Sequence, residues 1–125
     1  MSDIKNPRIY IREKIHDEIK KVVENYFYIT YNKAQYPYAI VDIKEIGNEV
    51  LTQYVLDVSV YDKKEDTTVL EKVCDDLKIL LDRKKEIDKN YAFAIWFNAC
   101  LTDKEEEKTI KKRILSFEIH LFNYK

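Results

Sequence analysis

The sequence is poor in the residues from which small-molecule and metal sites are usually built. Its 125 residues contain one glycine, two cysteines and two histidines. A single glycine supplies no glycine-rich loop for a phosphate, and the chain has no P-loop, dinucleotide fingerprint, nucleophile elbow or zinc-protease motif. Cys74 and Cys100 show neither CxxC nor cysteine–histidine spacing, so we predict two buried, reduced thiols. We therefore expect no disulfide scaffold, no metal and no cofactor.

Residues for acid–base chemistry are also too few, or wrongly spaced. Glu118 and His120 share one strand face, but two ligands do not make a metal site, and spacing indicates no third. Asp75 and Asp76 are neighbours on a predicted helix, where successive side chains point about 100° apart. Catalytic carboxylate pairs need a fixed separation, which a charged loop does not hold either. We predict that the chain is not an enzyme.

The charge balance and the short apolar runs exclude two further classes of partner. The chain carries 22 Lys and Arg against 23 Asp and Glu, for a formal net charge of -1. Such a balance creates no overall field to attract a phosphate backbone, so we do not expect nucleic acid as a partner. No apolar run approaches the roughly 20 residues of a membrane helix, and residues 1–5 carry no hydrophobic signal region. We expect a cytosolic protein with no membrane partner, folded as a single domain over residues 1–125.

The hydrophobic periodicity predicts an α+β fold. Apolar residues at three- and four-residue intervals predict helices over residues 9–25 and 69–81, the second capped by Asp66 or Thr67. Alternating apolar residues predict strands over residues 27–31, 38–43, 49–61, 91–101 and 113–124. The predicted order is α-β-β-β-α-β-β, with a hairpin turn at Gly47-Asn48. An antiparallel-rich sheet with both helices packed on one face, ending in a protruding C-terminal hairpin, would bury every apolar face.

The last two predicted strands are joined by an intensely charged excursion over residues 102–112. Ordinary hairpin loops have about 2–5 residues, so this segment is longer than a compact monomer needs. It could be a solvated loop whose internal ion pairs contribute little energy, or a docking element in which an acidic tip meets the basic return of the next subunit. Far earlier in the sequence, an aromatic cluster with a nearby lysine could stack nucleic-acid bases, but three acidic residues soon follow it, so core packing or a protein interface is favoured. The cluster is Tyr26, Phe27, Tyr28, Tyr31, Tyr36 and Tyr38 with Lys33, and the acidic residues are Asp42, Glu45 and Glu49. The candidate assembly residues are Asp103, Lys104, Glu105, Glu106, Glu107, Lys108, Lys111, Lys112, Arg113, Tyr31 and Tyr36.

Several of these elements together resemble a known family. They are the opening helix, the Tyr36-Pro37-Tyr38-Ala39-Ile40-Val41 entry to a strand, the long strand over 54–61 that leads into the helix over 69–81, and the closing strand over 113–122. Over residues 9–123 this arrangement resembles the tail-terminator, or tail-completion, minor tail proteins of long, non-contractile-tailed bacteriophages and prophages. The family is defined by pattern and order rather than by an invariant motif.

The resemblance implies a structural role. It implies a subunit that forms a homo-oligomeric ring, usually a hexamer, which caps the tail tube, stops its polymerisation and forms part of the head–tail joining interface. The implied partners are a second copy of the chain, the tail-tube protein and head–tail connector proteins. The protein would act in the host cytoplasm during assembly and then in the virion, at the head-proximal end of the tail. The charged excursion would order or move on assembly. The alternative is a small cytosolic adaptor or immunity-type binding module without catalytic activity.

Overall fold

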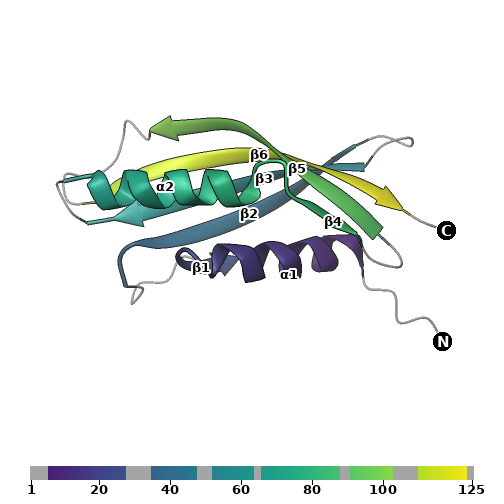
Figure 1. Ribbon diagram of the computed structural model, residues 1–125, viewed down its shortest axis with the longest axis horizontal. Helices are drawn as coiled ribbons and strands as arrows, with labels where there is room; N and C mark the ends of the chain where they lie inside the picture. Colours follow the sequence, from purple (N-terminus) through teal and green to yellow (C-terminus); the bar gives the residue numbers. More distant parts are fainter. Residues whose placement is uncertain are drawn as a thin grey trace.

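The computed structural model describes residues 6–27, 35–47, 52–63, 66–87, 91–102 and 110–123. Two helices and six strands follow one another in the order α-β-β-β-α-β-β-β (Figure 1). They are α1 (Pro7–Ile19), β1 (Glu24–Phe27), β2 (Tyr38–Gly47), β3 (Thr52–Asp62), α2 (Thr68–Leu81), β4 (Lys85–Ile87), β5 (Tyr91–Thr102) and β6 (Lys111–Asn123). Neither of the described helices is long and apolar enough to cross a membrane.

The six strands form one mixed sheet in the spatial order β1-β2-β3-β6-β5-β4. Only β1 and β2 run parallel, and the other four pairings are antiparallel. Both helices lie along the same side of this sheet (Figure 1). The predicted α+β class, with an antiparallel-rich sheet and two helices on one face, is confirmed.

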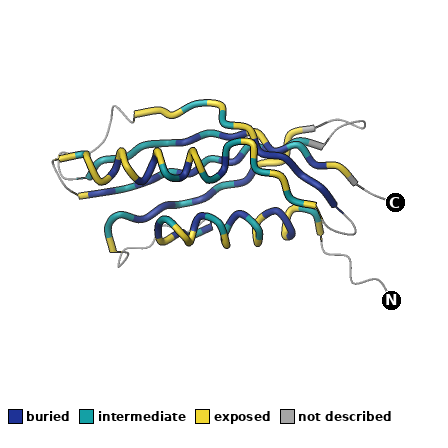
Figure 2. The backbone as a smooth tube through the Cα atoms, viewed as in Figure 1, coloured by how far each residue is buried: buried dark blue, intermediate teal, exposed yellow. Residues whose placement is uncertain are grey.

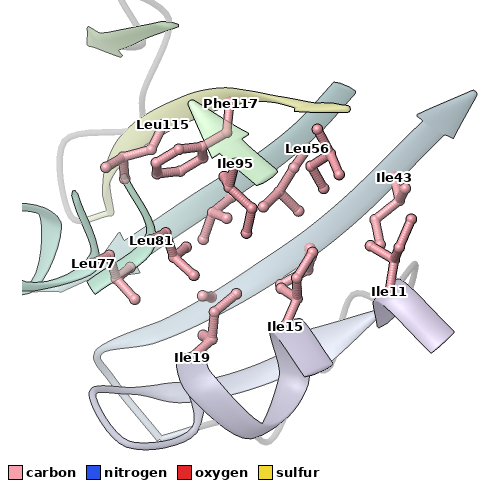
Figure 3. Packing of buried hydrophobic residues seen from close by; sticks show 14 of the residues in the cluster. Ile11, Ile15, Ile19, Ile43, Leu56, Leu77, Leu81, Ile95, Leu115 and Phe117 are labelled. Atoms are coloured by element: carbon pink, nitrogen blue, oxygen red, sulfur yellow. The ribbon is translucent and has the colours of Figure 1, made fainter. Parts of the chain in front are cut away.

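The core lies between the helices and the sheet. From Tyr54 to Val60 of β3 and from Leu115 to Leu121 of β6, every second residue is buried in the core, while the residues between them are intermediate or exposed (Figure 2). From the other side, Ile11, Ile15 and Ile19 of α1 and Leu77 and Leu81 of α2 point into the same layer (Figure 3). Each fully buried side chain of this kind contributes about 1.5–3 kcal/mol relative to an exposed one, so the layer anchors both helices.

The first helix is shorter than predicted. Its apolar spacing continues through Val22 and Val23, but α1 ends at Ile19, and the amides of both valines donate to the Ile19 carbonyl in a closing turn. The chain then enters β1, which pairs in parallel with residues 38–41 of β2. This long-range pairing satisfies the backbone from Glu24 onward, so it prevails over a pattern that is equally compatible with a helix. The predicted first strand accordingly begins three residues early, and residues 28–31 lie outside the described part.

The second helix is confirmed almost residue for residue. It begins at Thr68, next to the N-cap Thr67, and the Asp66 carboxylate accepts a hydrogen bond of 2.9 Å from the Thr68 amide. At the other end Asp82 is extended, and Arg83 has a φ of 63° that turns the chain toward β4. The strand β4 was not predicted. It contains only three residues and exists because it pairs with residues 92–94 of β5.

The remaining strands differ from prediction mainly at their ends. The β2–β3 hairpin is present, with Gly47 paired to Thr52, although its turn lies outside the described residues. The strands flanking the charged excursion extend into it, so the connection they leave spans residues 103–110. One irregularity interrupts β5: Phe97 pairs with Phe117 and Ala99 with Ser116, which leaves Asn98 as the extra residue of a β-bulge.

The bulge decides where Cys100 lies. Cys100 pairs with the core residue Leu115 and interacts with the side chain of Cys74 on α2, yet it is exposed while Cys74 is buried. The prediction of two buried thiols is therefore wrong for Cys100. Its exposure follows from the sheet edge, because β4 pairs only with residues 92–94 and covers β5 no further. Burial raises the pKa of the Cys74 thiol to about 12, and burial also raises the pKa of Cys100.

Candidate functional site: the open face of the sheet

The side of the sheet opposite the helices is covered by neither of them. Residues there alternate along each strand with the core residues, and we call this surface the open face. It is defined by Tyr38, Ile40, Asp42, Gln53, Val55, Asp57, Ser59, Tyr61, Lys85, Ile87, Ala92, Ala94, Trp96, Leu101, Ser116, Glu118, His120 and Phe122. Apolar and aromatic side chains on an uncovered sheet are typical of a surface that binds another protein.

Four tyrosines gather where β2 begins and β3 ends. The ring of Tyr38 stacks on Tyr61 at a centroid distance of 5.0 Å, and the rings of Tyr36 and Tyr26 lie 5.1 Å and 6.2 Å from Tyr38. Burial, followed by the neighbouring Tyr36 and Tyr61, raises the pKa of Tyr38 to about 12. The four rings form one packed unit.

Two lysines complete this unit. The Lys63 ammonium lies 5.3 Å from the Tyr36 ring centroid, and the Lys112 ammonium lies 5.4 Å from that of Tyr61. Such cation–π contacts contribute about 0.5–1 kcal/mol at exposed sites. We call the six residues Tyr26, Tyr36, Tyr38, Tyr61, Lys63 and Lys112 the tyrosine–lysine cluster. It offers hydroxyl groups, aromatic edges and two positive charges, which suits an acidic protein surface.

The cluster unites two residues that the sequence placed in an assembly site. Tyr36 and Lys112 are 76 positions apart in the chain, and both belong to it. Lys111 begins β6 next to Lys112 and lies in register with Asp62 of β3. The other predicted residues, Asp103, Lys104, Glu105, Glu106, Glu107, Lys108 and Tyr31, lie outside the described residues.

Arg113 has a different setting. Its Nε lies 2.7 Å from Oε1 of Glu71 on α2, and its Nη1 donates to the carbonyl of Lys112 at 3.0 Å. The Arg113 side chain is only 13% exposed, whereas that of Glu71 is 52% exposed. The guanidinium therefore ties β6 to α2 within the subunit.

The far part of the open face contains a hollow that the sequence did not predict. Its floor is formed by Ala92 and Ala94 of β5, each flanked across the sheet by larger residues of β4 and β6. One cross-strand row is Ile87, Ala92 and Phe122, and the next row is Lys85, Ala94 and His120. Trp96 and Phe93 complete the lining of a hollow of about 360 Å³, which we call the alanine-floored hollow.

The walls of the hollow are mainly apolar. Ile87, Trp96 and Phe122 are 71%, 39% and 51% exposed, so three large apolar side chains meet water around one depression. The only sign of it in the sequence is the alternation of alanine with large residues in Tyr91-Ala92-Phe93-Ala94-Ile95-Trp96. The walls come from two other strands, so the depression appears only once the sheet is assembled.

His120 at the edge of this hollow has two polar neighbours. Its Nε2 lies 3.6 Å from Oε2 of Glu118 and 3.4 Å from Nε2 of Gln53. Within the described residues, no group of three or more His, Cys, Asp or Glu side chains could hold a metal ion. Gln53, Glu118 and His120 thus place hydrogen-bonding groups at the edge of the hollow.

Comparisons with known proteins bear on the fold. No family model matches the chain, and no curated protein matches it by sequence. Among solved structures, the chain resembles a chain described as "Virion of native gene transfer agent (GTA) particle", with a TM-score of 0.63 at 10% sequence identity. The match covers 93% of this chain and 92% of that one. The two chains therefore share a fold over nearly their whole lengths.

Proposed function

We propose that the protein is a structural component of a phage-like virion and that it terminates the tail. The observation that carries this proposal is the structural match to a chain from a gene transfer agent virion, which covers 93% of this chain and 92% of that one. The independent resemblance of its sequence elements to tail-terminator proteins supports the same assignment. An assembly role also suits a chain whose most distinctive surface is an uncovered sheet face with a packed aromatic cluster.

In this proposal the protein forms a ring, with six subunits as the expected number, on the end of the tail tube. The ring stops polymerisation of the tube and presents a surface to the head–tail connector. Its partners are further copies of itself, the tail-tube protein and connector proteins. It acts first in the host cytoplasm and then at the head-proximal end of the tail.

The proposed assembly interface combines the charged excursion with the tyrosine–lysine cluster. The acidic tip formed by Glu105, Glu106 and Glu107 of one subunit would meet Lys111 and Lys112 of the next. Tyr36 and Tyr31 would supply apolar area and hydroxyl groups at this contact. Arg113, also among the predicted interface residues, would hold β6 in place through its ion pair with Glu71.

The experiment is to delete the gene in its phage or prophage and to image the particles by electron microscopy. Loss of a terminator should give tails of uncontrolled length that fail to join heads, and the purified protein should restore joining in an extract. Particles of normal length that contain no copies of the protein would contradict the proposal. Monomers or tight heterodimers with a host protein would favour the adaptor.

A charge-reversal variant tests the interface itself. Replacing Glu105, Glu106 and Glu107 by lysine should weaken self-association or tail capping while leaving the thermal midpoint unchanged. A matched control replaces the exposed acidic residues Glu13, Asp17 and Glu24, which lie on α1 and β1. If both triple variants lost self-association or tail capping equally, the effect would come from the change in net charge and not from the acidic tip.

A further inference from the structure

One isoleucine of α2 projects from the helix surface away from the core. Ile79 is 78% exposed, the highest value among the large apolar side chains of the described residues. Asp75 lies one turn before it on the helix, and Asp82, the extended residue that follows the helix, borders the same surface. We call Asp75, Ile79 and Asp82 the Ile79 knob.

Lys78 borders the same surface as the knob, and both Lys78 and the neighbouring Lys72 have contacts within the subunit. The Lys78 ammonium lies 4.5 Å from the Phe97 ring centroid, toward the sheet, and Lys72 pairs with Asp76 at 3.2 Å. Asp82 accepts a hydrogen bond of 2.8 Å from the Phe97 amide through Oδ1, and no described residue bonds to its Oδ2. The knob is thus an apolar tip with two carboxylates beside it and the Lys78 side chain between them and the sheet.

The alanine-floored hollow has the complementary chemistry. Its walls are apolar, and its second row carries Lys85 and His120 on either side of Ala94. Among the described residues the Lys85 ammonium forms no ion pair, and Glu118 on the same face lies 3.6 Å from His120. A volume of about 360 Å³ falls within the 300–1,000 Å³ typical of ligand-binding pockets, so the hollow has room for an isoleucine side chain.

We propose that the Ile79 knob of one copy of this chain docks in the alanine-floored hollow of a second copy. Ile79 would enter between Trp96 and Phe122, while the knob carboxylates meet Lys85 and His120. The knob lies on the outer surface of a helix and the hollow lies on the open face, on opposite sides of the sheet. Two different patches make a head-to-tail contact, which generates rings or filaments rather than a closed two-fold dimer.

This inference deepens the proposed function and rests on it for the biological setting, because it supplies a contact by which a ring would close. It uses a different surface from the charged excursion and can be tested separately. Burying one isoleucine in an apolar site corresponds to a change of roughly 10- to 100-fold in an association constant. Ile79→Arg should therefore weaken self-association at least about tenfold.

The decisive experiment mixes two complementary variants. Ile79→Arg destroys the knob and keeps the hollow, while Phe122→Asp damages the hollow and keeps the knob. Each variant alone should be monomeric in sedimentation velocity at concentrations where the wild type assembles. A mixture of the two should give a 1:1 heterodimer that grows no further, because it contains one intact pair of patches. Ile9→Arg, the same change at an exposed position of α1, is the matched control and should assemble as the wild type does.

Trp96 provides a second measurement that does not depend on comparing variants for yield or folding. It is the only tryptophan of the chain and lines the hollow, so docking should shift its fluorescence to shorter wavelength as wild-type concentration rises. Ile79→Arg with an unchanged thermal midpoint should abolish the shift.

A wild type that stays monomeric at every concentration, or an Ile79→Arg protein that assembles normally, would overturn the docking. So would a mixture that gives no heterodimer. Failure of the proposed function has a separate readout, since it concerns whether the protein is present in particles and controls tail length. Normal rings and capping in Ile79→Arg would remove the knob contact and leave the tail role standing.

Discussion

Replacing Arg113 by alanine would distinguish a residue that stabilises the subunit from one that serves assembly. The sequence grouped Arg113 with Lys111 and Lys112, but in the structure its guanidinium is bonded to Glu71 of α2. We expect Arg113→Ala to lower the free energy of unfolding. Lys112→Ala, which removes a cation–π contact at the surface, should affect assembly more than stability.

The magnitude follows from the setting of the pair. Exposed ion pairs contribute about 0.2–1 kcal/mol, and hydrogen bonds to charged groups about 1.5–3 kcal/mol. Arg113 is 13% exposed but Glu71 is 52% exposed, so water screens one side of the contact. We therefore expect a loss of about 1–1.5 kcal/mol, which for a domain of this size is a fall of roughly 5 °C in the thermal midpoint.

The assay is urea denaturation of the wild type, Arg113→Ala, Glu71→Ala and the double variant, followed by circular dichroism. A double-mutant cycle should give a coupling energy of about 0.5–1 kcal/mol between the two side chains. Unchanged stability in Arg113→Ala, with additive effects in the cycle, would refute the structural role. If Arg113→Ala lost assembly without losing stability, Arg113 would be an interface residue.

Three further predictions concern the core and two titrating groups. Ile15→Ala should cost about 2–5 kcal/mol because Ile15 is fully buried beneath the sheet, while Ile9→Ala at the exposed surface of α1 should change stability by less than about 0.5 kcal/mol, both measured by denaturation. Burial alone would raise the pKa of Glu18, but its hydrogen bonds to Lys21 and Lys84 and the charges of these lysines outweigh burial and lower that pKa. The contribution of Glu18 to stability should therefore be present above the pKa of the unfolded chain and lost as pH falls through the pKa of the folded protein. Glu18→Gln should flatten that acid-side dependence of the midpoint. The pKa of Tyr38 is raised to about 12, so stability should fall as pH rises from about 10 to about 12, and Tyr38→Phe should remove that loss; a stability that is flat in both pH windows would contradict the ion pair and the tyrosine packing.

The hydrophobic pattern predicted the structure correctly where the whole pattern lies within a single helix or strand. The apolar stripe of α2 and the alternation of β3 and β6 are complete within one segment, so their faces were predicted correctly. The end of α1 was not, because Val22 and Val23 fit a helix and only the pairing of β1 with β2 shows where the helix stops. The strand β4 has three residues and no propensity signal, and its partner in β5 determines it.

The surface was less predictable than the core for the same reason. Tyr36 and Lys112 were predicted to belong to one assembly surface, but the contacts that join them depend on β2, β3 and β6 lying side by side. The alanine-floored hollow needs three strands in register before it exists. Ile79 stands outside the apolar stripe of α2, and its exposure has meaning only beside a depression of complementary chemistry.

The single extra residue of the β5 bulge has a consequence for how this chain can tolerate changes in length. Phe97 pairs with Phe117 and Ala99 with Ser116, so the partner strand has no residue opposite Asn98 and the bulge absorbs it. If Asn98 were deleted, Ala99 would follow Phe97 in regular alternation, so Cys100 would stay on the helix side and Leu101 on the open face. The chain can therefore lose one residue at this position without interchanging the apolar and polar sides of the end of the strand.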